Sequence, residues 1–225
     1  MQAYIFDFNG TLYPDKELHY LAWKQFMAGH GIAITYQIFE EHMYGPANDE
    51  IVRYFLGDDI PQPVVRRYSR EKEAIYRQIA MDDPDSQALA DGAPEMLDLM
   101  AARGIPHAIA TASMPENVDF YFTTLGIGRW FDRAHVFFDE FGLPGKPDPA
   151  IYRLAMQRLG YDPSATTVVE DSMSGIRAAA GAGVGRIIAI DTTLGPKAFA
   201  GMPEVFAVIH DFNGFERFFK TENEN

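Results

Sequence analysis

Short apolar runs recur along the chain and indicate buried β-strands. They are separated, from the second run onward, by stretches in which apolar residues fall at helical spacing. The predicted strands cover residues 3–6, 107–110, 134–138, 167–169, 186–190 and 206–209, and the helices between them cover 94–103, 149–159 and 174–182. Strands that read as continuous apolar runs and alternate with helices are typical of a parallel sheet covered on both faces. The pattern therefore predicts an α/β protein with a Rossmann-like parallel sheet as its core.

One long segment breaks this alternation. Between residues 16 and 85 the apolar positions keep to helical spacing, and no convincing strand interrupts them. We expect about four helices there, inserted between the first strand and the rest of the sheet. The predicted domains are thus an α/β core made of residues 1–15 and 86–225 and a helical-bundle cap made of residues 16–85.

Composition narrows the class of protein. The 225 residues are 47% hydrophobic, enough for a full core, and the net charge of -13 argues against nucleic acid or an anionic membrane as a partner. The absence of cysteine excludes disulfides and thiolate chemistry. No apolar stretch approaches the roughly 18 residues of a membrane span, and the first strand begins too early for a signal peptide. We expect a soluble, cytoplasmic monomer that acts on a small metabolite.

The first predicted strand ends in a run of chemically informative residues. Asp7 follows the strand directly and opens the sequence Asp7-Phe8-Asn9-Gly10-Thr11. A glycine in such a turn lets backbone amides approach an anion. A carboxylate at this place can serve as a nucleophile toward phosphorus.

Three later strands end in polar residues as well. They are followed by Thr111-Ala112-Ser113, by a loop that holds Lys146 between Gly145 and Pro147, and by Glu170-Asp171. In parallel α/β sheets, ligands bind outside the carboxyl ends of the strands. We therefore expect all of these groups in one pocket. Each alone would be explained by a turn, a helix cap or a solvated charge, but their joint order favours a site.

The chemistry of these groups is mutually consistent. Asp7 and Asp171 can share Mg²⁺, a hard ion that prefers carboxylate and phosphate oxygens. Lys146 and the Thr111 hydroxyl can stabilise the charge on a transferring phosphoryl group. Gly10, Ala112 and Ser113 complete the expected phosphate-binding surface.

These motifs resemble the haloacid dehalogenase superfamily, in its β-phosphoglucomutase-like branch, over essentially the whole chain. The resemblance implies that Asp7 is the nucleophile and a Mg²⁺ ligand, with Asp171 as a second ligand and Glu170 as a close supporting carboxylate. It implies that the metal also takes the main-chain carbonyl of Asn9. The segment 16–85 resembles the cap that closes over the active site in this branch.

Asn9 departs from the family pattern. Phosphatases and mutases of this family carry an aspartate there, which protonates the leaving oxygen, whereas an amide has no transferable proton. Loss of a positioned general acid typically costs about 10²–10⁴ in rate. The alternatives are a phosphatase with reduced activity, a relative that binds phosphate ligands without turnover, or an asparagine introduced to trap a complex. A mutase or a dehalogenase fits less well, because the usual arginine of the mutases and tyrosine of the dehalogenases are missing.

The cap contains one candidate for substrate recognition. A Gly-Pro turn presents Asn48 at the start of a predicted helix, where its amide could bind a sugar hydroxyl. A plain helix N-cap is the favoured explanation of this residue.

Taken together, the motifs predict a Mg²⁺-dependent phosphatase of small phosphorylated metabolites that forms an aspartyl-phosphate.

Overall fold

The computed structural model of the protein describes residues 2–138, 143–191, 199 and 201–219. The loop predicted to hold Lys146 runs from residue 142 to 149, and its first residue, Gly142, lies outside these ranges. The chain divides into two compact units, one formed by Asp15–Gln87 and the other by the rest of the chain. No helix among the described residues is both long and apolar enough to cross a bilayer.

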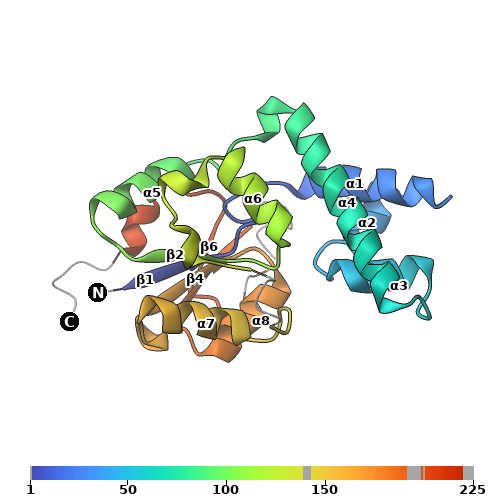
Figure 1. The fold of residues 1–225 in the computed structure, drawn as a ribbon. Coiled ribbons are helices and arrows are strands. Elements are labelled where there is room, and N and C mark those ends of the chain that lie inside the picture. The colour runs from blue at the N-terminus through green and yellow to red at the C-terminus, as the bar shows by residue number, and fades with distance from the viewer. Residues whose placement is uncertain (1, 139–142, 192–198, 200, 220–225) are drawn as a thin grey trace. The chain divides into compact units, whose positions relative to one another are not determined.

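The larger unit is built on one parallel sheet of six strands (Figure 1). The spatial order is β3-β2-β1-β4-β5-β6, so that the N-terminal strand lies inside the sheet. The strands are β1 (Ala3–Phe6), β2 (His107–Ala110), β3 (Val136–Phe137), β4 (Thr166–Glu170), β5 (Arg186–Ile190) and β6 (Ala207–Ile209). The predicted parallel α/β core is confirmed.

Helices cover both faces of this sheet. α7 (Ala150–Leu159) and α8 (Met173–Ala182) lie on one face, and α5 (Ala93–Ala102) and α6 (Pro115–Thr123) lie on the other (Figure 1). The face under α7 and α8 buries alternate strand residues, which include Ile5, Ala108 and Val168. Short 3₁₀ helices lie at Pro84–Ser86, Ile127–Arg129, Arg133–His135, Pro163–Ala165 and Phe215–Phe218.

The register of the central strands aligns their carboxyl ends. Phe6 pairs with Ile109 of β2 and with Val169 of β4. The residues that follow these positions in each strand therefore leave the sheet at the same edge. This alignment gathers the ends of β1, β2 and β4 around one site.

The structure departs from two predictions in this unit. The third strand is shorter than the predicted 134–138, because Arg133–His135 form a 3₁₀ helix with the Asp132 side chain accepting from the amide of Ala134. The helix α6 was not predicted at all. It begins with Pro115 and is rich in aromatic residues, which have modest helix propensity, so the burial of Val118, Phe120 and Tyr121 stabilises it instead.

The smaller unit consists of four helices. They are α1 (Lys16–Gly29), α2 (Tyr36–His42), α3 (Asn48–Leu56) and α4 (Gln62–Asp82). Their shared apolar core contains Trp23, Phe26, Met27, Ile34, Phe39, Met43, Ile51, Val52 and Val65. The four-helix prediction for this segment agrees with these elements.

A buried polar network links three of these helices. The Nζ of Lys72 in α4 lies 2.8 Å from Glu73 Oε1 and 2.6 Å from the Nδ1 of His19 in α1. The side-chain amide of Asn48 in α3 donates to the same Glu73 oxygen at 2.8 Å. Lys72 and Glu73 are almost wholly buried. The expected N-cap role of Asn48 is wrong, because Ala47 occupies the cap position and the Asn48 side chain is used in this network.

Candidate active site

The first element of the site is the turn that follows β1. Its start is fixed by a hydrogen bond from the amide of Asp7 to the carbonyl of Val169, which keeps Asp7 in line with the sheet. Gly10 has a φ of 76°, a left-handed conformation that favours glycine. A Cβ on Gly10 would lie 2.2 Å from Asp171 Oδ2, so only glycine lets the turn approach Asp171 this closely. Asp7 and Asp171 are both 7% exposed.

Lys146 bridges the ends of β1 and β4. Its Nζ lies 2.6 Å from Asp7 Oδ1 and 2.6 Å from Glu170 Oε1, and it donates to the carbonyl of Ala110 at 3.1 Å. Burial alone would lower the pKa of Lys146, but the charges of Asp7 and Glu170 outweigh it and hold that pKa well above its ordinary value. The lysine is therefore a fixed cation beside the Asp7 carboxylate.

Glu170 is held by protein donors on both of its oxygens. Oε1 accepts from Tyr152 at 3.0 Å as well as from Lys146, and Oε2 accepts from the amide and the hydroxyl of Ser172 at 2.8 and 2.9 Å. Gly175 packs so closely against this carboxylate that an added Cβ would lie 1.7 Å from Oε1. Burial, followed by the charge of Glu170, raises the pKa of Tyr152 well above its ordinary value, so its hydroxyl keeps the proton that it donates. These contacts fix the Glu170 carboxylate, which in turn holds the Lys146 ammonium in place.

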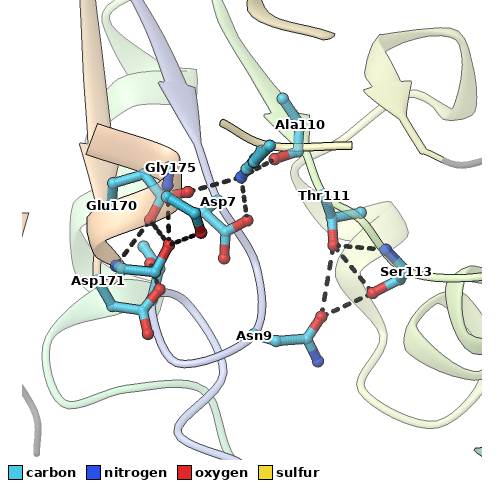
Figure 2. A network of polar contacts seen from close by, with 12 residues as sticks. Asp7, Asn9, Ala110, Thr111, Ser113, Glu170, Asp171 and Gly175 are labelled. Carbon is cyan, nitrogen blue, oxygen red and sulfur yellow. Dashed lines mark hydrogen bonds and ion pairs between the residues drawn. The ribbon is translucent and has the colours of Figure 1, made fainter. Parts of the chain in front are cut away.

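The side chain of Asn9 faces the loop that follows β2 (Figure 2). Its Oδ1 accepts from Ser113 at 2.6 Å and from Thr111 at 3.4 Å, and its Nδ2 donates to Tyr121 at 2.9 Å. Thr111 and Ser113 are buried, whereas Ala112 between them is exposed. Residue 9 is thus tied to the end of β2, while Glu170 and Asp171 lie on the other side of Asp7 (Figure 2).

The site has a modest set of oxygen donors for a cation. Within the described ranges, no three His, Asp or Glu side chains converge on a common point. Asp7 and Asp171 flank the Gly10 turn, and the Thr11 hydroxyl donates to Asp171 Oδ1 at 3.3 Å. Two carboxylates with one main-chain carbonyl suit Mg²⁺, which usually keeps several waters and needs one or two carboxylates.

Sequence reasoning missed three residues of this site. Tyr121, Tyr152 and Ser172 all contact its predicted members, through Asn9 in the first case and Glu170 in the others. Ser172 could have been found, since it stands directly after Asp171 and caps α8 by accepting from the Gly175 amide. The two tyrosines lie inside helices, where nothing in the local pattern separates them from core aromatics. Asn48 belongs to the unit Asp15–Gln87, where its amide binds Glu73.

The fold agrees with comparisons to known proteins. A sequence model of the haloacid dehalogenase-like hydrolases matches residues 1–183, and the chain belongs to this family of hydrolases. It is 28% identical over 193 residues to a phosphorylated carbohydrates phosphatase from Thermotoga maritima. The matched region covers 84% of this chain and 85% of the relative. The prediction of the family from its motifs is confirmed.

Two solved structures resemble the protein over most of its length. A family IA, variant 3 hydrolase from Entamoeba histolytica is 32% identical, with a TM-score of 0.88 and 95% of both chains covered. CbbY from Rhodobacter sphaeroides is 28% identical, with a TM-score of 0.79 and coverage of 94% of this chain and 95% of that one. That CbbY structure carries an aspartate-to-asparagine substitution and contains xylulose-(1,5)bisphosphate.

Proposed function

We propose that this protein is a phosphatase of small phosphorylated carbohydrates that works through an aspartyl-phosphate on Asp7. The observation that carries the proposal is the Lys146 bridge, in which one buried ammonium lies 2.6 Å from Asp7 Oδ1 and from Glu170 Oε1 at the carboxyl edge of the sheet. The names of similar proteins support the substrate class, because one acts on phosphorylated carbohydrates and another was solved with a sugar bisphosphate.

The proposed reaction has two steps. In the first, an oxygen of the Asp7 carboxylate attacks the phosphorus, the bond from phosphorus to the ester oxygen breaks, and that oxygen takes up a proton from solvent water as the alcohol leaves. In the second, water cleaves the acyl phosphate, which releases inorganic phosphate and restores the carboxylate. Lys146 holds positive charge beside the Asp7 carboxylate, and the Thr111 and Ser113 hydroxyls offer donors to the phosphoryl group.

We propose Asp7, Asp171 and the main-chain carbonyl of Asn9 as the residues that hold Mg²⁺. Glu170 supports this arrangement through Lys146, since its two oxygens accept from protein donors. When bound, Mg²⁺ screens the repulsion between the Asp7 carboxylate and an anionic phosphate.

Asn9 favours a second candidate function. Its amide cannot give a proton to the leaving oxygen, and its described side-chain partners are the hydroxyls of Thr111, Ser113 and Tyr121. A protein of this kind could bind phosphorylated ligands and hydrolyse only esters with good leaving groups.

We propose that the unit Asp15–Gln87 acts as the cap that selects the substrate.

The test compares three chains on a panel of sugar phosphates and on p-nitrophenyl phosphate in the presence of Mg²⁺. Asn9→Asp should raise kcat on the sugar phosphates by about 10²-fold or more, the usual size of general acid catalysis. The gain should be much smaller on p-nitrophenyl phosphate, whose leaving group needs no acid. Asp7→Asn should remove the activity toward both kinds of ester.

Two results would change the conclusion. If Asn9→Asp gives no gain while phosphorylated ligands still bind, the protein is a binding relative rather than a phosphatase. If Asp7→Asn keeps the activity toward p-nitrophenyl phosphate, Asp7 is not the nucleophile.

A further inference from the structure

A closed ring of hydrogen bonds surrounds the side chain of residue 9. Asn9 Nδ2 donates to the Tyr121 hydroxyl at 2.9 Å, and this hydroxyl lies 3.0 Å from the Ser113 hydroxyl. The Ser113 hydroxyl in turn donates to Asn9 Oδ1 at 2.6 Å. The Tyr121 hydroxyl also lies 3.1 Å from Asn9 Oδ1, and the Ser113 hydroxyl lies 2.9 Å from that of Thr111.

The hydroxyls around residue 9 can hold either an amide or a carboxylate. Asparagine carries a donor and an acceptor on one planar group, whereas an ionised carboxylate carries acceptors alone. The Ser113 and Tyr121 hydroxyls lie 2.6 and 3.1 Å from Asn9 Oδ1, so both are placed to donate to an oxygen at this position. With asparagine, the Tyr121 hydroxyl can also accept from the amide.

Tyr121 is itself held firmly. It is 1% exposed, and its ring centroid lies 4.1 Å from that of Phe8 with the planes tilted by 32°. Ser113 is held in a different way. Its main-chain amide donates to Thr111 Oγ1 at 3.2 Å, and this hydrogen bond fixes the loop after β2. The two partners of Asn9 thus come from rigid surroundings, which fixes the direction of the residue 9 side chain.

We propose that Tyr121 is a positioning residue, which with Ser113 holds side chain 9 against the loop after β2. The kinetic part of this inference rests on the proposed phosphatase function. Its structural part concerns the Asn9 amide and does not require turnover.

The structural part can be tested by NMR on the protein labelled with ¹⁵N. In Tyr121→Phe the aromatic ring and its packing on Phe8 remain, but the acceptor of the Asn9 amide is lost. The Asn9 side-chain protons should then exchange with solvent about tenfold faster or more, following the usual strength of one hydrogen bond. Tyr54→Phe, at an exposed tyrosine of the other unit, should leave this exchange unchanged. Unchanged exchange in Tyr121→Phe overturns the inference.

The kinetic part uses the chain that carries Asn9→Asp. Adding Tyr121→Phe should lower its kcat by about tenfold or more with KM nearly constant, because a misplaced acid affects chemistry rather than binding. The same change in the chain that keeps Asn9 should have a smaller effect on kcat, since the amide there gives no proton. Equal effects in both chains would mean a merely structural role for Tyr121. If Asn9→Asp shows no turnover, the proposed function fails and the amide exchange alone decides this inference.

Discussion

Glycines set how closely the charged groups of the site approach one another. Gly10 faces Asp171 and Gly175 faces Glu170, and a Cβ at either place would overlap a carboxylate oxygen. The strain would be worse at Gly10, whose φ of 76° disfavours other residues. The close approach of Gly10 to the Asp171 carboxylate, and of Gly175 to the Glu170 carboxylate, therefore depends on glycines, which have no functional side chain.

The predicted cation site can be tested without any turnover. Because Mg²⁺ would bind the folded state alone, it should raise the melting temperature, and at 100 times its Kd it should stabilise the fold by about 2.7 kcal/mol. Asp171→Asn should abolish this rise in a Mg²⁺ titration followed by circular dichroism. Asp162→Asn, at an exposed carboxylate, should retain it. A normal response in Asp171→Asn would remove Asp171 from the site.

Single residues of the site could be predicted where they follow strands. Asp7, Thr111 and Glu170 each come directly after or at the end of an apolar run, and this position is visible in the sequence. The partners that hold Asn9 and Glu170 are different, because Tyr121 and Tyr152 reach them from inside helices. Only the packing of α6 and α7 decides where those hydroxyls lie.

Strands and helices of the core were predicted to different degrees for physical reasons. β2 and β5 agree with the apolar runs at both ends, since buried parallel strands leave a continuous apolar pattern. α6 left no such signal, because its aromatic and β-branched residues read equally well as a strand. Asn48 shows the same limit in the other unit, where a distant glutamate on α4 competes for the side chain.

The Lys72–Glu73 pair should contribute strongly to the stability of the four-helix unit. Lys72→Met would leave the almost fully buried Glu73 carboxylate without its cation, which typically costs about 3–5 kcal/mol. The double variant Lys72→Met/Glu73→Gln removes both charges and keeps an acceptor for Asn48, so it should recover most of that loss. Urea unfolding of the three chains measures both effects. A single variant as stable as the double one would contradict this account.

The whole molecule should lose stability steeply in alkaline solution. The pKa values of Lys146, Tyr152 and Tyr4 all lie above their ordinary values of 10.5, 10.0 and 10.0, and burial is the main cause for the tyrosines. Above about pH 10 the unfolded chain releases these protons while the folded chain keeps them, so unfolding becomes easier as pH rises. The contribution of these groups is fully present below pH 10.

The slope gives the test of this prediction. Three retained protons correspond to a decrease of about 4 kcal/mol in the free energy of unfolding per pH unit, or about 1.4 for each group. Tyr152→Phe should reduce the slope by about one third. Urea unfolding at several values between pH 9 and 11.5 measures it. A slope that is identical in Tyr152→Phe would show that Tyr152 keeps no proton that the unfolded chain loses.

The place of β1 inside the sheet also bears on how the protein is made. β1 is translated before both of its neighbours, which are encoded much later, and the site joins residues 139 apart for Lys146 and Asp7 and 160 apart for Asp171 and Thr11. Chains are synthesised from the N-terminus, so β1 waits for β2 while the four-helix unit is translated, and for β4 until much of the core has followed. A chain that stops before β4 therefore carries the proposed nucleophile Asp7 but lacks Glu170 and Asp171, so it cannot assemble the site.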